Sequence, residues 1–292
     1  MKELLLKGCG TALFTPFTKE GGVDEDAFAA SVRRQVDAGI DLLVPLGTTG
    51  ETPCLSDEEK LRVLSVAKEN AAGRPVVAGV GTNSVAGTLA NMQLLESADA
   101  FLVVVPYYNK PPQRGIYQYF KTIAGVTPKP VIVYNVPGRT GSNISAETTL
   151  ALAADVDNII GIKEASGNFA QIESILAAAP KDFAVLSGND GDTLSLMQKG
   201  AAGVISVASN VAPSLMAELT GALLRGDDAA AEAIDTCLQP LYDALFVESN
   251  PIPGKAAMHI LGLMENTLRL PLVPAEDKTV ELLKDVLQKL HL

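Results

Sequence analysis

Residues 159–165 read Ile159-Ile160-Gly161-Ile162-Lys163-Glu164-Ala165, a short apolar run that ends on a pair of charged residues. A continuously apolar run of this length is typical of a strand that is buried on both faces. Similar runs recur along the chain. The predicted strands are Gly10–Pro16, Leu42–Leu46, Val76–Val80, Ala100–Val105, Val131–Tyr134, Ile159–Lys163, Phe183–Ser187 and Gly203–Val207. Because most of these runs do not alternate in polarity, they indicate a parallel sheet covered by helices.

Segments with helical spacing separate the strands. Asp24–Ala38 carries apolar residues at every fourth position, and Ser56–Asn70 opens with a capping box. Ser145 is a suitable N-cap for a further helix. Strands that alternate with helices eight times predict an α/β fold, the (β/α)8 or TIM barrel. The alternative is an open doubly wound sheet, but no Gly-x-Gly-x-x-Gly follows the first strand.

More chain follows the last predicted strand than one closing helix requires. Helical patterns in this part of the sequence cover Pro213–Leu224, Asp227–Phe246, Pro253–Leu261 and Ala275–Leu290. We therefore expect a barrel over residues 1–224 and a C-terminal helical domain, an appendage to the barrel, over residues 225–292.

The composition argues against several classes of function. A net charge of −11, with the Lys and Arg residues scattered, disfavours a nucleic-acid surface. Three cysteines and two histidines form no sequence cluster, so neither a disulfide framework nor a zinc site is expected. Sparse cysteines suit a reducing cytosol, so we expect a cytoplasmic protein. The apolar runs are too short for a membrane span, and we expect no membrane partner.

Lys163 is the residue that first suggests a chemistry. Active sites of (β/α)8 barrels lie at the carboxyl ends of the strands, and Lys163 follows a buried one. Desolvation lowers the pKa of a lysine, which makes its amine nucleophilic near neutral pH. Lys163 is therefore a candidate Schiff-base residue. The structural alternative is a lysine that reaches solvent or pairs with Glu164.

Other polar residues end neighbouring strands. Thr48 and Thr49 lie between two glycines, where their amides and hydroxyls could bind a carboxylate or relay protons, although such residues also form ordinary turns. Tyr134 could act as a general acid or base. Arg139 has the planar fork that suits a substrate carboxylate, although it could equally be a solvated side chain.

Together, these motifs resemble the dihydrodipicolinate synthase / N-acetylneuraminate lyase family. The resemblance covers nearly the whole chain, and the order and spacing of the motifs make it specific. The motifs are Gly47-Thr48-Thr49-Gly50-Glu51, Pro106-Tyr107-Tyr108-Asn109, Tyr134-Asn135-Val136-Pro137-Gly138-Arg139-Thr140-Gly141, Gly161-Ile162-Lys163-Glu164-Ala165-Ser166-Gly167 and Ser187-Gly188-Asn189-Asp190.

The resemblance implies a reaction. The threonine pair and Arg139 make the chain most similar to members that condense pyruvate with L-aspartate 4-semialdehyde, in the diaminopimelate route to lysine. It implies that pyruvate forms a Schiff base with Lys163, and that Tyr134, Thr49 and Tyr108 transfer protons. In the family, Tyr108 reaches into the site of a neighbouring subunit, so a homodimer or homotetramer is expected. The iminium acts as the electron sink, so neither a metal nor another cofactor is expected.

The resemblance also implies how the substrates bind. Arg139 would hold the carboxylate of the semialdehyde. Thr48 and Thr49 would hold the carboxylate of pyruvate. The main-chain carbonyl of Ile205 would face the site, and Gly188 would leave room beside it.

One group of residues departs from the pattern of members that lysine inhibits. Those members carry histidines in the helix after the threonine pair and a glutamate after the third strand, where this chain has Asp57, Lys60 and Gly87. Asn83 and Tyr107 match. Because Lys60 would oppose a cationic effector and Gly87 removes its carboxylate partner, we expect lysine to inhibit weakly or not at all.

Two other functions fit parts of the pattern. One is a related lyase that acts on a sugar acid such as N-acetylneuraminate or a keto-deoxy-gluconate, against which Arg139 argues. The other is a barrel that binds a small molecule without catalysis. Loss of Lys163 or Tyr134 would indicate that second function, and the chain retains both residues.

Overall fold

The computed structural model describes residues 6–292 and contains eight parallel strands with helices between them. The strands are β1 Gly8–Ala12, β2 Leu42–Val44, β3 Val77–Gly79, β4 Ala100–Val104, β5 Val131–Asn135, β6 Ile159–Glu164, β7 Ala184–Ser187 and β8 Gly203–Ser206. All eight belong to one sheet. The fold is therefore the predicted (β/α)8 barrel, and a helical C-terminal region follows it.

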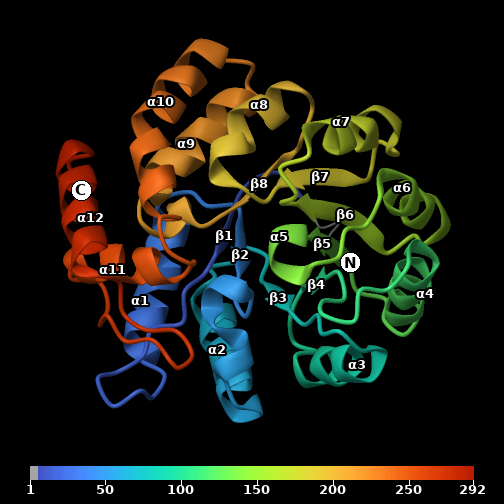
Figure 1. Ribbon diagram of the computed structural model, residues 1–292, viewed down its shortest axis with the longest axis horizontal. Helices are drawn as coiled ribbons and strands as arrows, with labels where there is room; N and C mark the ends of the chain where they lie inside the picture. The colour runs from blue at the N-terminus through green and yellow to red at the C-terminus, as the bar shows by residue number, and fades with distance from the viewer. Residues whose placement is uncertain (1–5) are drawn as a thin grey trace. The chain divides into compact units, whose positions relative to one another are not determined.

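Residue contacts group the chain into two compact units. One contains residues 6–7 and Val77–Ile205, and we call it the central unit; the other contains Gly8–Val76 and Ser206–Leu292, and we call it the terminal unit. In the central unit, strands β3 to β8 follow one another in sequence order. Its helices are α3 Val85–Leu94, α4 Gln113–Ala124, α5 Pro137–Thr140, α6 Ala146–Asp155, α7 Phe169–Ala178 and α8 Thr193–Gln198. Figure 1 shows α4, α6 and α7 along the outer side of the strands of this unit.

The strands of the central unit are buried because helices cover them. Val131, Ile132 and Val133 of β5 are fully buried, and α4 turns Ile116 and Phe120 inward. The continuous apolar runs of the sequence thus reflect burial on both faces of the strands, as expected for a parallel sheet.

The terminal unit combines the beginning and the end of the chain. It contains β1, β2 and the helices α1 Glu25–Asp37, α2 Asp57–Asn70, α9 Pro213–Leu224, α10 Asp228–Ala244, α11 Ile252–Ile260 and α12 Asp277–Lys289. The capping box predicted at Ser56 is present, with Glu59 as its second member. The domain boundary predicted after Leu224 falls between α9 and α10, which pack against each other.

The first strand differs from its prediction. It covers Gly8–Ala12 and pairs with β2, with Gly10 opposite Leu42. Beyond Leu13, the amide of Phe14 donates to the side-chain Oδ1 of Asn210 at 3.3 Å, so the apolar sequence continues while the strand pairing ends. Apolar character alone therefore overestimates the length of this strand.

Candidate active site

Lys163 and Tyr134 are brought together by the pairing of β5 and β6. The register places Tyr134 opposite Lys163, and the Lys163 Nζ lies 4.5 Å from the centroid of the Tyr134 ring. Both side chains are at the carboxyl ends of their strands, and Lys163 is only 5% exposed. The aromatic face favours a cation, which suits a site where a protonated imine forms.

The surroundings of Lys163 change its acidity. The pKa of Lys163 is lowered to about 8, mainly by burial; the carboxylate of Asp190 opposes this shift, and the nearby charge of Arg139 adds to it. Asp190 is itself buried and follows β7. An amine with a pKa near 8 is partly neutral at physiological pH, as a nucleophile must be.

Glu164 has a different role from that of a partner to Lys163. Successive residues of a strand point to opposite faces, so the two side chains diverge. The Glu164 carboxylate accepts hydrogen bonds from Asn135 Nδ2 at 3.1 Å, Gln171 Nε2 at 3.0 Å and the Ser166 amide at 2.9 Å. These donors satisfy the buried Glu164 side chain, which is 1% exposed. The structural alternative, in which Lys163 reaches solvent or pairs with Glu164, is therefore wrong.

Arg139 lies in the short helix α5, directly after β5, and is exposed. The amide of Tyr108, in the loop after β4, donates to the Thr140 carbonyl at 3.2 Å. Tyr108 has a left-handed backbone, with φ of 70°, and its residue is 86% exposed. The loop thus presents the phenol of Tyr108 outward.

Gly188 and Ile205 are the remaining residues of the central unit that the sequence predicts for the site. The Gly188 amide donates to the Glu164 carbonyl at 2.7 Å. A Cβ on Gly188 would lie 2.5 Å from the Cβ of Ala165, so only glycine fits beside the residues that follow Lys163. Ile205 is the third residue of β8 and is 1% exposed, and the orientation of its carbonyl toward the site stays a prediction.

The threonine pair belongs to the terminal unit, in a single 3₁₀ turn that follows β2. Thr48 is exposed and Thr49 is buried, at 4% exposure. Asn250 Nδ2, from the segment before α11, donates to Thr49 Oγ1 at 2.9 Å. Leu46 and Glu51, on either side of the turn, both have left-handed backbones, with φ of 61° and 53°. Such conformations persist in non-glycine residues only where surrounding contacts hold them.

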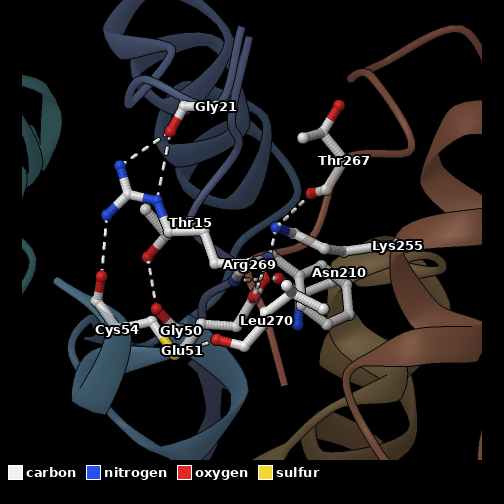
Figure 2. Close-up of polar contacts among 11 residues, drawn as sticks. Thr15, Gly21, Gly50, Glu51, Cys54, Asn210, Lys255, Thr267, Arg269 and Leu270 are labelled. Carbon is white, nitrogen blue, oxygen red and sulfur yellow. Dashed lines mark hydrogen bonds and ion pairs between the residues drawn. The ribbon is translucent and has the colours of Figure 1, made fainter. Parts of the chain in front are cut away.

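A fully buried ion pair lies at the end of this turn. Lys255 of α11 donates to Glu51 Oε1 at 2.5 Å and to the Thr267 carbonyl at 2.9 Å, as Figure 2 shows. The Arg269 amide donates to Glu51 Oε2 at 3.0 Å. Burial lowers the pKa of Lys255, and the charge of Glu51 and its hydrogen bond oppose that shift.

Arg269 ties the same turn to more distant parts of the terminal unit. Its guanidinium donates to the carbonyls of Gly21 and Cys54, both at 2.7 Å, and forms an ion pair with Glu59 of α2 (Figure 2 shows the two carbonyl contacts). The turn that carries the threonine pair is therefore fixed by side chains from the C-terminal region.

Asn250, Lys255 and Asp190 were not predicted from the sequence as residues of the site. Lys255 carries the same signal as Lys163, a charged residue within an apolar run, here Ile252–Ile260. The contact between Asn250 and Thr49 joins residues 201 positions apart, so no local pattern could indicate it.

Neither a metal centre nor a membrane segment is found in residues 6–292. No group of three or more His, Cys, Asp or Glu side chains in these residues is arranged to hold a metal ion. No helix among them combines the length and the apolar character that a membrane crossing requires.

Comparisons with known proteins agree over nearly the whole length of the chain. The dihydrodipicolinate synthetase family matches residues 5–290. A 4-hydroxy-tetrahydrodipicolinate synthase from Thermotoga neapolitana is 49% identical over 291 residues, which cover 98% of this chain and 99% of that protein.

Solved structures agree as well. The crystal structure of a dihydrodipicolinate synthase from Thermotoga maritima is 46% identical, with a TM-score of 0.96 over 98% of this chain and 99% of that chain. A chloride-inhibited dihydrodipicolinate synthase from Acinetobacter baumannii, complexed with pyruvate, is 39% identical, with a TM-score of 0.95 over the same shares of the two chains.

Proposed function

We propose that Lys163 forms a Schiff base with pyruvate in this chain, which belongs to the dihydrodipicolinate synthetase family and is a lyase with 4-hydroxy-tetrahydrodipicolinate synthase activity. The observation that carries the proposal is the buried Lys163 amine, with a pKa of about 8, against the Tyr134 ring. The family chemistry requires no metal.

The proposed reaction begins with attack of the neutral Lys163 amine on the ketone carbon of pyruvate. Water leaves, and a protonated imine forms. The cationic nitrogen draws electrons, so the methyl group loses a proton and an enamine results. The enamine carbon then attacks the aldehyde carbon of L-aspartate 4-semialdehyde, and the new alkoxide takes up a proton. Attack of the semialdehyde's own amine on the imine carbon closes the ring and frees Lys163.

Three hydroxyl groups would carry the protons. Tyr134 would exchange protons with the reacting centre, because its ring lies over the Lys163 amine. Thr49 and Tyr108 would continue the relay to solvent. Active sites of (β/α)8 barrels lie at the carboxyl ends of the strands, and both Thr49 and Lys163 lie at or after such ends, which supports the assignment of Thr49.

The remaining residues would bind the two carboxylates. Thr48 and Thr49 would hold the carboxylate of pyruvate, and the Arg139 fork would hold that of the semialdehyde. The Ile205 carbonyl would face the imine, and Gly188 would keep the space beside Lys163 open.

We propose that the chain works as a homodimer or homotetramer. The outward loop with Tyr108 at 86% exposure supports this, since a large exposed aromatic side chain on a tied-down loop is typical of a contact surface. In such a dimer, each Tyr108 would serve the site of its partner subunit.

Reductive trapping tests the role of Lys163. Incubation with pyruvate and borohydride should add one reduced pyruvate to the protein, and peptide mass spectrometry should place it on Lys163. The Lys163→Arg variant should give no adduct, whereas Lys199→Arg, a surface control, should react like the parent chain. An adduct on any other lysine, or none, would overturn the proposal.

The role of Arg139 distinguishes this reaction from that of the sugar-acid lyases. We expect Arg139→Ala to raise KM for the semialdehyde while trapping of pyruvate continues. Loss of a bidentate contact to the semialdehyde carboxylate weakens the binding of that substrate and leaves the binding of pyruvate unchanged. Unchanged kinetics with the semialdehyde, or release of pyruvate from N-acetylneuraminate, would contradict the assigned substrate.

A further inference from the structure

The hydroxyl of Thr49 is held from one side by an amide of the C-terminal region. Asn250 Nδ2 donates to Thr49 Oγ1 at 2.9 Å, and both residues are buried, at 6% and 4% exposure. An amide nitrogen can only donate, so it occupies a lone pair of the Thr49 oxygen. The proton of the Thr49 hydroxyl must then point to a different acceptor.

The backbone under Thr49 is fixed independently of this contact. Thr15 Oγ1 donates to the Gly50 carbonyl at 2.8 Å, and the Lys255 ammonium binds the Glu51 carboxylate from α11. Glu51 holds its left-handed conformation inside this arrangement. Because the backbone is held, the Thr49 hydroxyl can still change its orientation, and the hydrogen bond from Asn250 restricts this orientation.

We propose that Asn250 is a positioning residue for the reaction, which sets the Thr49 hydroxyl as a proton donor. The inference rests on the proposed role of Thr49 in the proton relay. A hydroxyl whose lone pair accepts a strong hydrogen bond is a better donor, because hydrogen bonds in a chain polarise one another. The C-terminal region would thus contribute to catalysis through Asn250, which lies 201 positions after Thr49 in the sequence.

Kinetics of single and double variants test the proposal. We expect Asn250→Ala to lower kcat about tenfold with little change in KM for pyruvate, since loss of orientation affects the transition state more than binding. The near-isosteric Asn250→Asp should be at least as slow, because its carboxylate takes the Thr49 proton as an acceptor. Trapping of pyruvate on Lys163 should proceed in both variants.

A double-mutant cycle separates positioning from general loosening. Thr49→Val should lower kcat, and adding Asn250→Ala should then cost nothing more, because no hydroxyl is left to orient. Thr15→Val, which loosens the same turn without touching the Thr49 hydroxyl, is the matched control. Its effect should be the same in the parent and in Thr49→Val. Melting temperatures of all variants would be recorded with the kinetics.

Each outcome decides something. If Asn250→Ala slows Thr49→Val as much as it slows the parent, the positioning role is wrong while the proposed function stands. Full kcat in Asn250→Asp would likewise contradict only the positioning role. If Thr49→Val keeps full activity, the role of Thr49 in the proposed function is wrong, and the positioning role falls with it.

Discussion

Lys163 should impose a pH dependence on imine formation. Its pKa is lowered to about 8 by burial, so the reactive neutral amine is the minor form at lower pH. Below that value the neutral fraction falls about tenfold per pH unit, and above it the fraction saturates. We expect the rate of pyruvate trapping to rise with pH and to level off above about pH 8. A rate that stays flat between pH 6 and 9 would contradict this.

The charges of Asp190 and Arg139 allow a test of whether the Lys163 amine controls this pH dependence, because they shift its pKa in opposite directions. Asp190 raises the pKa of Lys163, so Asp190→Asn should move the inflection to lower pH. Arg139 lowers it, so Arg139→Ala should move the inflection to higher pH. Shifts of the same sign in both variants would mean that another group controls the rate.

Lys255 should be required for stability. It and Glu51 are both fully buried, so Lys255→Met leaves a carboxylate without its cation. Breaking a buried pair in this way typically costs about 3–5 kcal/mol. The double variant Glu51→Gln with Lys255→Met should recover part of the loss, because no charge then stays buried. The measurement is urea denaturation.

A surface pair provides the control for that experiment. Lys284 and Glu281 lie one turn apart on α12 with most of their surface exposed. Lys284→Met should change the free energy of unfolding by less than about 1 kcal/mol, because solvent screens exposed pairs. If Lys255→Met changed the free energy of unfolding as little as this control does, the prediction would be wrong. Water or a rearrangement would then stabilise the Glu51 carboxylate without Lys255.

At the scale of elements, the apolar runs predicted the strands well, and the reason is physical. Strands buried on both faces need continuous apolar sequence, so β2 to β8 lie within one or two residues of their predictions. The pairing of Tyr134 with Lys163 could also be expected, because both end neighbouring parallel strands. The short helix α5 and the turn at Thr48–Gly50 carry no periodic signal. The contacts of Asn250 and Lys255 depend on tertiary packing that no local pattern encodes.

The position directly after β7, Gly188, should not tolerate a side chain. A Cβ there would lie 2.5 Å from the Ala165 Cβ and 3.0 Å from the Glu164 carbonyl. Gly188→Ala must therefore displace the residues that follow Lys163, at a typical cost of about 1–3 kcal/mol. We expect lower kcat and a lower melting temperature.

Gly138→Ala is the matched control for this prediction. Gly138 lies in α5 next to Arg139, and a Cβ there would meet nothing within 4 Å. Both variants add one methyl group near the candidate site, so only steric overlap distinguishes them. Equal melting temperatures for the two variants would contradict the prediction.

At the scale of the whole molecule, the chain should be insensitive to lysine. The Lys60 ammonium lies 2.9 Å from Asp57 and carries a positive charge on the helix where the family resemblance implies histidines in members that lysine inhibits. Gly87 supplies no carboxylate for the effector. Because like charges oppose binding, millimolar lysine should leave the steady-state rate nearly unchanged. Strong inhibition below 1 mM would contradict this expectation.

Subunit mixing tests whether Tyr108 acts in the site of a partner. Lys163→Ala and Tyr108→Ala homodimers should both be nearly inactive. In a mixed dimer, one site would carry both substitutions, while the other would combine an intact Lys163 with an intact Tyr108 from the partner.

Random re-pairing of equal amounts of the two variants should therefore restore about a quarter of the parent activity. Half of the dimers would be mixed, and one of the two sites in each mixed dimer would be intact. If Tyr108 served its own subunit, both sites of the mixed dimer would be defective, and the mixture would show only the average of its parents. The 86% exposure of Tyr108 and its anchored, left-handed backbone favour recovery.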